Sequence, residues 1–376
     1  MASVYVLYTG GTIGCEQTSS GLSPMPEPQF AALVASMPGL ENGQVASYDI
    51  SYTIDQFNVD GAATILDSSN MSPSDWVNIA IQIAANYDAY DGFVVLHGTD
   101  TMAFTASALS FLLPGLSKPV ILTGSQIPLQ FTLTDALPNL VGAIVLAGTQ
   151  PDIPEVCLYF DSLLLRGNRS AKVNANQFAA FESPNFPPLA TVGTVMTVNT
   201  DLILPMPGDD TSLSVAANLS SVQAQLSALA ANVTTFSVVV LILYPGIQTS
   251  TVLQVVLGNT SPPVQGLVIM AFGEGNGPVE NTAFMTALEN ANAAGVVLMD
   301  NTQVLAGSVE DAYATGLGAA GAVSAGDMTP EASLAKLVYL LGTGTSPADA
   351  RTQMQEDFCG EITPAESSGT TTLAVM

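Results

Sequence analysis

Residues 91–101 constrain the fold of this chain more than any other stretch. The stretch begins with a compact run of aliphatic and β-branched residues, which is typical of a buried strand. A turn with hydroxyl and carboxylate groups follows, and residues 102–113 then place apolar side chains at helical spacing. Parallel sheets present reactive groups at the carboxyl ends of strands in this strand, turn and helix arrangement. Thr99 and Asp100 are therefore the first candidates for functional side chains.

The rest of the chain alternates between short apolar runs and helical patterns. Strands are expected at residues 4–8, 119–123 and 155–160, and helices at residues 72–86 and 135–147. This alternation predicts an α/β fold whose larger N-terminal domain holds a parallel, Rossmann- or flavodoxin-like sheet. The segment after this domain lacks a clear pattern, and the strands then resume.

Two domains are expected because 376 residues exceed what one hydrophobic core usually serves. A βαβ pattern at residues 266–299 predicts a smaller α/β C-terminal domain. We expect the boundaries to be an N-terminal domain at residues 1–198, a linker at 199–235, a C-terminal domain at 236–362 and a disordered tail at 363–376.

Charge narrows the range of partners. Six Lys and Arg residues against 32 Asp and Glu residues give a formal net charge of −26, which argues against nucleic acid or an anionic membrane as a partner. The apolar runs stay at strand length, below the ~18–20 residues of a membrane span. The chain opens directly on a strand pattern with no basic leader, so we expect a soluble, cytoplasmic protein.

Metal and disulfide chemistry have little support in the sequence. The three cysteines are far apart, so neither a disulfide framework nor a metal-ligand spacing is visible. The single histidine, His97, cannot belong to a multi-histidine metal site. At the end of a strand it is more often a structural hydrogen-bonding residue than a catalytic base. We therefore expect no metal and no cofactor.

A threonine, a carboxylate and a lysine can be combined chemically. The glycine-rich run at residues 9–14 follows the first strand, and it can be read either as a ligand loop or as a tight turn. Half of the cations, Arg166, Arg169 and Lys172, lie within seven positions, which is hard to explain as a solvated patch. A lysine near a carboxylate can take the proton of a threonine hydroxyl, and glycine N–H groups can stabilise an oxyanion. The residues by themselves thus indicate acyl transfer with a threonine nucleophile.

Five ordered motifs extend this interpretation. The motifs at residues 9–14 and 96–102 resemble the paired signatures of L-asparaginases, and the motifs at 67–69, 124–128 and 166–172 match in the same order. The chain is most similar to the bacterial cytoplasmic, type I branch, from about residue 4 to residue 363. The resemblance implies hydrolysis of L-asparagine to L-aspartate and ammonia through a β-aspartyl enzyme ester, without metal or cofactor.

The resemblance also implies roles for individual residues. Thr12 is the primary nucleophile, and Thr99, Asp100 and Lys172 form a second triad. In that triad Thr99 orients or activates water, Lys172 accepts or relays its proton, and Asp100 orients the lysine and meets the substrate ammonium.

Substrate binding is carried over from the same motifs. Ser68 and Ser69 would hold the α-carboxylate and the α-amine, although the sequence around them favours helix capping on its own. The other substrate-binding positions are Gly11, Gly98, Asn276 and Glu310. The resemblance implies tetramers built from intimate dimers, so we expect a homodimer or homotetramer. The segments that contain Asn276 and Glu310 resemble those with which a neighbouring chain closes the site.

One departure from the family pattern bears on activity. The family has a tyrosine in the loop after the nucleophile, where this chain has Leu22, and we expect residues 15–28 to form a mobile loop over the strand ends. Leucine cannot relay a proton, and a positioned acid–base group contributes about 10²–10⁴-fold in rate. One alternative is therefore a catalytically weakened protein that binds an amino acid. Another is an asparaginase-like subunit of a tRNA-dependent amidotransferase, which the acidic charge and the missing amino-terminal extension disfavour.

Overall fold

The computed structural model describes residues 1–250, 260–310 and 315–364. The chain divides into two compact units, Met1–Thr234 and Thr235–Met376. The expected α/β fold, with a larger N-terminal and a smaller C-terminal part, is confirmed. The predicted tail at 363–376 lies almost entirely outside the described residues.

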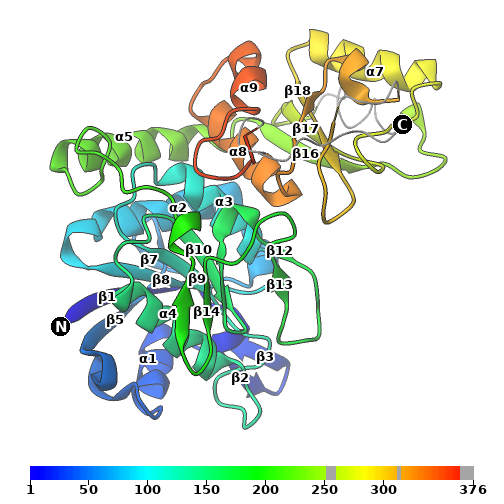
Figure 1. The fold of residues 1–376 in the computed structure, drawn as a ribbon. Coiled ribbons are helices and arrows are strands. Elements are labelled where there is room, and N and C mark those ends of the chain that lie inside the picture. The colour runs from blue at the N-terminus through cyan, green and yellow to red at the C-terminus, as the bar shows by residue number, and fades with distance from the viewer. Residues whose placement is uncertain (251–259, 311–314, 365–376) are drawn as a thin grey trace. The chain divides into compact units, whose positions relative to one another are not determined.

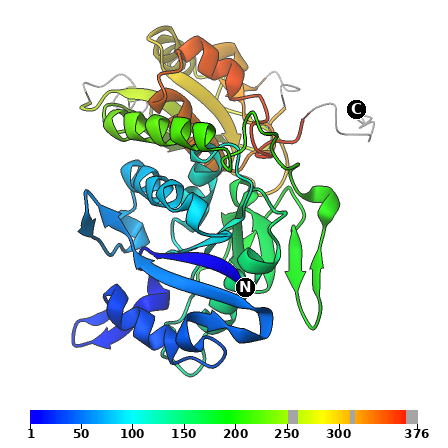
Figure 2. The same ribbon diagram turned by 90° about the vertical axis from the view of Figure 1, so that its left-hand side faces the viewer.

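A nine-stranded sheet forms the centre of the first unit (Figure 1). Its strands in spatial order are β15 (Met196–Val198), β14 (Ala190–Val192), β11 (Leu163–Arg166), β10 (Val156–Phe160), β9 (Val120–Thr123), β8 (Gly92–Leu96), β1 (Ala2–Tyr8), β5 (Ile50–Gln56) and β4 (Gln44–Val45). The strands from β10 to β5 are parallel, as the alternation of strands and helices predicts. The strands β11, β14, β15 and β4 are antiparallel additions at the two edges, so the sheet is mixed and the prediction of a parallel sheet holds for its centre only. Figure 2 shows the β14–β15 ribbon, in green, at one edge of the sheet.

Helices cover both faces of this sheet. The helices α2 (Pro73–Ala85) and α3 (Met102–Leu112) lie on one face, and α1 (Glu27–Ala35) and α4 (Ala136–Thr149) lie on the other (Figure 1). The start of α2 follows from its capping residues, because the Asp75 carboxylate accepts hydrogen bonds from the backbone N–H and the hydroxyl of Ser72 at 2.8 and 2.6 Å. Pro73 occupies the first helical position, where its missing N–H is harmless.

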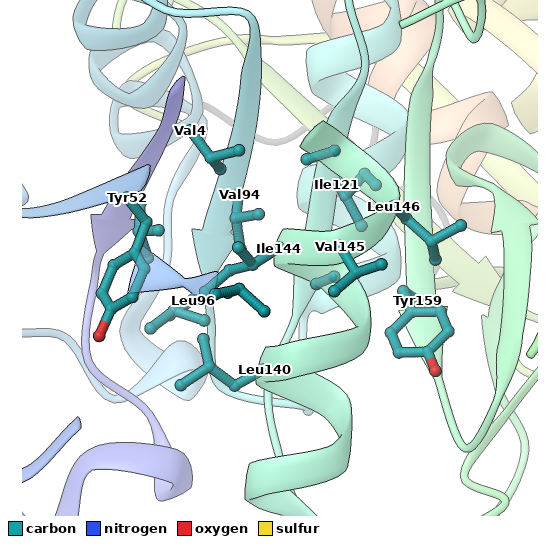
Figure 3. Packing of buried hydrophobic residues seen from close by; sticks show 14 of the residues in the cluster. Val4, Tyr52, Val94, Leu96, Ile121, Leu140, Ile144, Val145, Leu146 and Tyr159 are labelled. Carbon is teal, nitrogen blue, oxygen red and sulfur yellow. The ribbon is translucent and has the colours of Figure 1, made fainter. Parts of the chain in front are cut away.

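The main core of the first unit lies between the sheet and α4. Figure 3 shows Val4, Val94 and Ile121, from three adjacent strands, packed against the aliphatic residues Leu140, Ile144 and Val145 of α4. Every residue of β8 is buried, which explains its unbroken apolar pattern. The first residue of this strand, Gly92, has no room for a side chain, because a Cβ there would lie 2.3 Å from the carbonyl oxygen of Ala147. The close approach of α4 to β8 therefore requires glycine at position 92.

Two stretches differ from the sequence-based expectations. Residues 15–28 are not a loop throughout, because β2 (Cys15–Thr18) and β3 (Gly21–Pro24) form an antiparallel hairpin. Residues 199–235 include the 17-residue helix α5 (Ala216–Asn232), which packs against α2 and belongs to the first compact unit. The predicted linker therefore contains a helix whose buried leucines, including Leu219 and Leu226, explain why it folds onto this unit.

The second unit has a four-stranded parallel sheet. Its strands in order are β16 (Ser237–Ile242), β17 (Val264–Ala271), β18 (Val297–Thr302) and β19 (Val323–Ser324). The helix α7 (Thr282–Ala293) connects β17 to β18, which confirms the βαβ pattern, and buries Phe284 and Leu288 against them. The helices α8 (Pro330–Gly342) and α9 (Pro347–Gln353) also belong to this unit.

A buried ion pair holds the end of the second unit. The Lys336 amine on α8 lies 2.6 Å from the Glu361 carboxylate, and both side chains are fully buried. The same amine donates to the carbonyl oxygens of Met354 and Glu356. Residues 354–361 therefore wrap around one lysine. No helix within the described ranges is both long and apolar enough to cross a membrane.

Candidate active site

Three polar turns lie side by side at the carboxyl edge of the first sheet. The strands β1, β8 and β9 are neighbours, and each ends in a polar turn, at residues 9–14, 97–101 and 124–127. The strand ends are in register, because Tyr8 pairs with Leu96 and Leu96 pairs with Thr123. The topology therefore brings the predicted threonine motifs together, as expected for ligand sites of parallel sheets.

The first two turns pack backbone to backbone. Thr9 donates from both its N–H and its hydroxyl to the carbonyl oxygen of Leu96, at 3.0 and 2.9 Å. Gly11 has a φ of 80°, and a Cβ on it would lie 2.5 Å from the backbone nitrogen of Gly98. Glycine at position 11 thus permits both the left-handed backbone and the close approach. Thr12 follows directly, at the start of the short η1 helix (Thr12–Gly14).

The serine segment joins the same cluster. Gly11 donates its N–H to the carbonyl oxygen of Leu66 at 3.2 Å, so this N–H is not available to an oxyanion. A Cβ on Gly98 would lie 2.5 Å from the hydroxyl oxygen of Ser68. Thr101 ties the turns together by donating its hydroxyl hydrogen to the carbonyl oxygen of Ser68 at 2.8 Å. Gly11, Gly98 and Ser68 therefore lie together, as the sequence predicts.

Asp67 caps the short η4 turn (Ser68–Asn70). Its carboxylate accepts hydrogen bonds from the N–H and the hydroxyl of Ser69, both at 2.9 Å. The expectation that a serine hydroxyl of this motif is the cap was therefore wrong, because the capping side chain is that of Asp67. The Ser69 side chain is also exposed, whereas Ser68 is buried. A role for both serines in substrate binding stays a prediction.

The predicted lysine triad is assembled. Lys172 lies on β12 (Ala171–Lys172), which pairs with β13 (Phe181–Glu182). Its Nζ is 2.8 Å from Thr99 Oγ1 and 2.7 Å from Asp100 Oδ1. Thr99 is buried, whereas the Asp100 side chain is 64 % exposed, so the triad reaches from the protein interior to the surface. This arrangement can hold a hydroxyl beside a base and a carboxylate beside a bound cation.

The two arginines near Lys172 are structural. The Arg166 guanidinium forms a buried ion pair with Glu155 at 2.6 Å, and it also donates to the carbonyl oxygen of Leu202. Arg169 is buried, and both guanidinium groups lie over the ring of Phe186. The cluster is therefore not a solvated basic patch. It anchors the segment that leads into Lys172.

His97 is a buried hydrogen-bonding residue, as expected. Its Nδ1 is 2.7 Å from the carbonyl oxygen of Gly98, which can only accept, so Nδ1 carries the hydrogen. Its Nε2 then accepts from the hydroxyl of Thr105 at 2.9 Å. Burial lowers the pKa of His97 to about 4, because the charged form loses its hydration. The neutral ring positions the turn that carries Thr99.

The β2–β3 hairpin follows Thr12 directly. Leu22 lies on β3 opposite Gln17 and is 51 % exposed. At the base of the hairpin, Cys15 is buried, and burial raises the pKa of its thiol to about 11. The Cys15 thiol is therefore protonated at neutral pH and is a poor nucleophile. This leaves Thr12 as the nucleophile candidate on this side of the turn.

Two predicted residues belong to the second unit. Asn276 pairs with Phe272 through backbone hydrogen bonds of 2.8 and 2.9 Å, and its side-chain oxygen accepts from Thr315. Glu310 donates its N–H to the carbonyl oxygen of Glu274 at 3.3 Å. The segments that hold Asn276 and Glu310 are thus adjacent within this unit.

Gln126 lies beside Thr99, although the sequence assigns it no role of its own. It lies in the turn after β9, and its Oε1 is 3.4 Å from Thr99 Oγ1. The polar turn after β9 is visible in the sequence as a candidate for a functional segment, but the sequence alone does not show which side chain of that turn faces Thr99. Among the described residues, no cluster of three His, Cys, Asp or Glu side chains could hold a metal ion.

Comparison with known proteins identifies the family. The model described as "Asparaginase, N-terminal" matches residues 3–204, and the model described as "Glutaminase/Asparaginase C-terminal domain" matches residues 237–354. The chain belongs to the asparaginase family. This asparaginase-family chain is 40% identical to L-asparaginase 1 of Escherichia coli K12 over 367 residues, which cover 96% of this chain and 98% of that protein.

Two further relatives extend the comparison. The 60 kDa lysophospholipase of Mus musculus is 40% identical over 377 residues, covering 95% of this chain but 62% of that protein. The crystal structure of L-asparaginase I from Vibrio cholerae has a TM-score of 0.77 and 37% identity, covering 96% of this chain and 99% of that one. The Vibrio cholerae structure shares the fold of this asparaginase-family chain, and all three proteins match most of its length.

Proposed function

We propose that this protein hydrolyses L-asparagine to L-aspartate and ammonia. The observation that carries the proposal is the position of the Lys172 amine, 2.8 Å from the Thr99 hydroxyl and 2.7 Å from the Asp100 carboxylate, beside a glycine turn that ends in Thr12. A threonine that forms an acyl-enzyme and a second threonine with its own base divide amide hydrolysis into two simpler steps.

In the first step the Thr12 hydroxyl oxygen attacks the side-chain amide carbon of asparagine. The C–N bond breaks, the amide nitrogen takes up the threonine proton and leaves as ammonia, and a β-aspartyl ester forms on Thr12. The Thr12 hydroxyl makes no hydrogen bond to any other described residue, so it is free to approach a substrate. Leu22 cannot relay this proton, which leaves proton transfer to the Lys172 triad.

In the second step water attacks the ester. Thr99 orients the water, and Lys172 accepts its proton through the Thr99 hydroxyl. The ester C–O bond breaks, Thr12 recovers its proton, and aspartate leaves. The Asp100 carboxylate would bind the substrate ammonium, and its exposure of 64 % supports this role. Ser68 and Ser69, with the backbone around Gly11 and Gly98, would bind the rest of the amino acid.

The second unit has a part in this proposal. We propose that the protein is a homodimer or homotetramer in which Asn276 and Glu310 of a neighbouring chain complete each site. The adjacency of their two segments supports a shared role. A cytoplasmic location fits the three free cysteines, of which Cys15 and Cys157 are buried.

Ammonia release from L-asparagine tests the proposal. The assay compares the wild-type protein with Thr12→Ala, and Thr191→Ala at an exposed position of β14 is the matched control. We expect release by the wild type and the control, and release lower by at least about 10²-fold in Thr12→Ala. Equal release by the wild type and Thr12→Ala would refute the assignment of Thr12.

The alternatives give different results in the same experiment. A catalytically weakened binding protein would bind L-asparagine in calorimetry but release no ammonia above the Thr12→Ala variant. An amidotransferase subunit would need tRNA, which the net charge of −26 disfavours as a partner. Parallel assays with L-glutamine over a range of concentrations determine which amide is preferred.

A further inference from the structure

We propose that Gln126 sets the direction of the Thr99 hydroxyl and thereby the pH range in which Lys172 can accept a proton. This inference rests on the proposed function, and it assigns a positioning role to a residue that the reaction steps above do not use. Thr99 and Gln126 lie at equivalent places in the sheet, because each follows by three residues one member of the register pair Leu96 and Thr123.

The side-chain amide of Gln126 has one defined orientation. Its Nε2 donates to the carbonyl oxygen of Gln177 at 3.0 Å, and a carbonyl oxygen can only accept. Its Oε1 must therefore face Thr99 Oγ1, at 3.4 Å. The backbone below it is also fixed, because the buried Asp135 carboxylate accepts from the N–H groups of Gln126 and Ile127 at 2.9 and 3.0 Å.

The Gln126 amide connects Thr99 to the hairpin that carries Lys172. Gln177 lies in the loop between β12 and β13, the hairpin that carries Lys172. Gln126 thus contacts Thr99 with one end of its amide and the hairpin of Lys172 with the other. The distance between the lysine amine and the threonine hydroxyl is therefore held by Gln126 as well as by their direct hydrogen bond.

The direction of the Thr99 hydrogen depends on the charge of Lys172. When the amine is protonated it donates to Thr99 Oγ1, so the threonine hydrogen points to Gln126 Oε1. When the amine is neutral, the Thr99 hydroxyl can turn and donate to the lone pair of Nζ. The acceptor on Gln126 stabilises only the first arrangement, and it therefore favours the protonated lysine.

Other charged groups surround this pair. The charged or titratable groups on the neighbouring elements include Cys15, Asp67, His97, Asp100, Asp135, Arg169 and Glu182. Asp100 contacts the amine directly, and Glu182 stands opposite Ala171, the residue before Lys172. All of them remain in place when only Gln126 is changed, so a comparison between variants isolates the effect of the amide.

Two substitutions of Gln126 move the titration in opposite directions. Gln126→Met keeps the length but removes the acceptor, so Lys172 should lose its proton at a pH lower by about half to one unit. Gln126→Glu keeps an acceptor and adds a negative charge, so the titration should move to higher pH. Gln44→Met, on the exposed position of the edge strand β4, is the matched control.

The primary measurement is the titration of Lys172 by NMR. The chain has three lysines, so protein labelled with ¹³C at the lysine side chains gives a spectrum in which each can be assigned. We expect the Lys172 midpoint to fall in Gln126→Met, to rise in Gln126→Glu and to stay unchanged in Gln44→Met. Identical midpoints in all four proteins would overturn the proposal.

The pH dependence of kcat with L-asparagine is the second measurement. The acid limb should shift to lower pH in Gln126→Met and to higher pH in Gln126→Glu, whereas a purely structural role would lower kcat equally at all pH values. Because the NMR titration needs no substrate, absence of ammonia release by the wild type would refute the proposed function alone. Shifted lysine midpoints with an unshifted acid limb would overturn the link between Gln126 and proton acceptance.

Discussion

Replacing Lys172 by methionine separates catalysis from stability. The substitution keeps most of the apolar stem but removes the amine that lies 2.8 Å from Thr99 Oγ1 and 2.7 Å from Asp100 Oδ1. A positioned acid–base group contributes about 10²–10⁴-fold, so we expect kcat for ammonia release to fall by that factor. The ion pair is partly exposed, with 20% of the lysine side chain and 64% of the aspartate side chain accessible. Such pairs contribute about 0–1 kcal/mol to the free energy of unfolding.

A second lysine provides the control. Lys118 donates to the carbonyl oxygens of Tyr87 and Tyr90 at 2.7 and 2.9 Å and lies over the Tyr87 ring, outside the candidate site. Lys118→Met should lower the free energy of unfolding by about 2 kcal/mol, because two carbonyl oxygens lose their charged hydrogen-bond donor. Its kcat should equal that of the wild type at a temperature where both are folded.

The assay measures steady-state ammonia release with L-asparagine, together with thermal unfolding of each variant. For Lys172→Met we expect a large loss of kcat, whereas Tm should decrease by less than about 4 °C. Retention of kcat within about tenfold of the wild type would refute the role of Lys172 as the base. An equal loss of kcat in Lys118→Met would show that the effect is not specific to the triad.

Three further predictions concern the hairpin, the second unit and the buried histidine. Leu22→Tyr should raise kcat by restoring a hydroxyl beside the nucleophile turn, and steady-state kinetics that show no change would mean that another group already serves there. Glu361→Gln should lower the free energy of unfolding by about 3–5 kcal/mol in denaturant titration, because it removes the negative charge that is paired with the fully buried Lys336 amine; a loss below about 1 kcal/mol would contradict this. His97 has a folded pKa of about 4 against an ordinary value of 6.5, so its contribution to stability is complete above pH 6.5 and is lost as the pH falls toward 4. His97→Asn should therefore flatten the decline of unfolding free energy over that range, and an unchanged slope in acid denaturation would count against the burial argument.

Local sequence patterns predict the centre of the first sheet well. The unbroken apolar run of β8 and the capping residues Ser72 and Asp75 have local causes, so a single stretch contains the necessary information. The β2–β3 hairpin was missed because its strands have only four residues each and carry polar side chains such as Glu16. The strands at the β11 edge were missed for a related reason, since β14 and β15 are only three residues long.

The candidate site depends on contacts that spacing alone does not encode. Lys172 meets Thr99 across 73 positions of sequence, and only the resemblance to a family paired them in advance. Arg166 was equally prominent as a rare cation, yet Glu155 buries it in a structural ion pair. Gln126 was missed because its role depends on the register between β8 and β9, which becomes visible only once the sheet is built.

The most direct test of the account is the location of the acyl group on the enzyme. The protein is mixed with L-asparagine, quenched in acid and analysed by peptide mass spectrometry, and the Lys172→Met and Thr12→Ala variants are treated in the same way. We predict one aspartyl ester on the peptide that contains Thr12, and none in Thr12→Ala. An ester on Thr99, or continued ammonia release by Thr12→Ala at the wild-type rate, would contradict it.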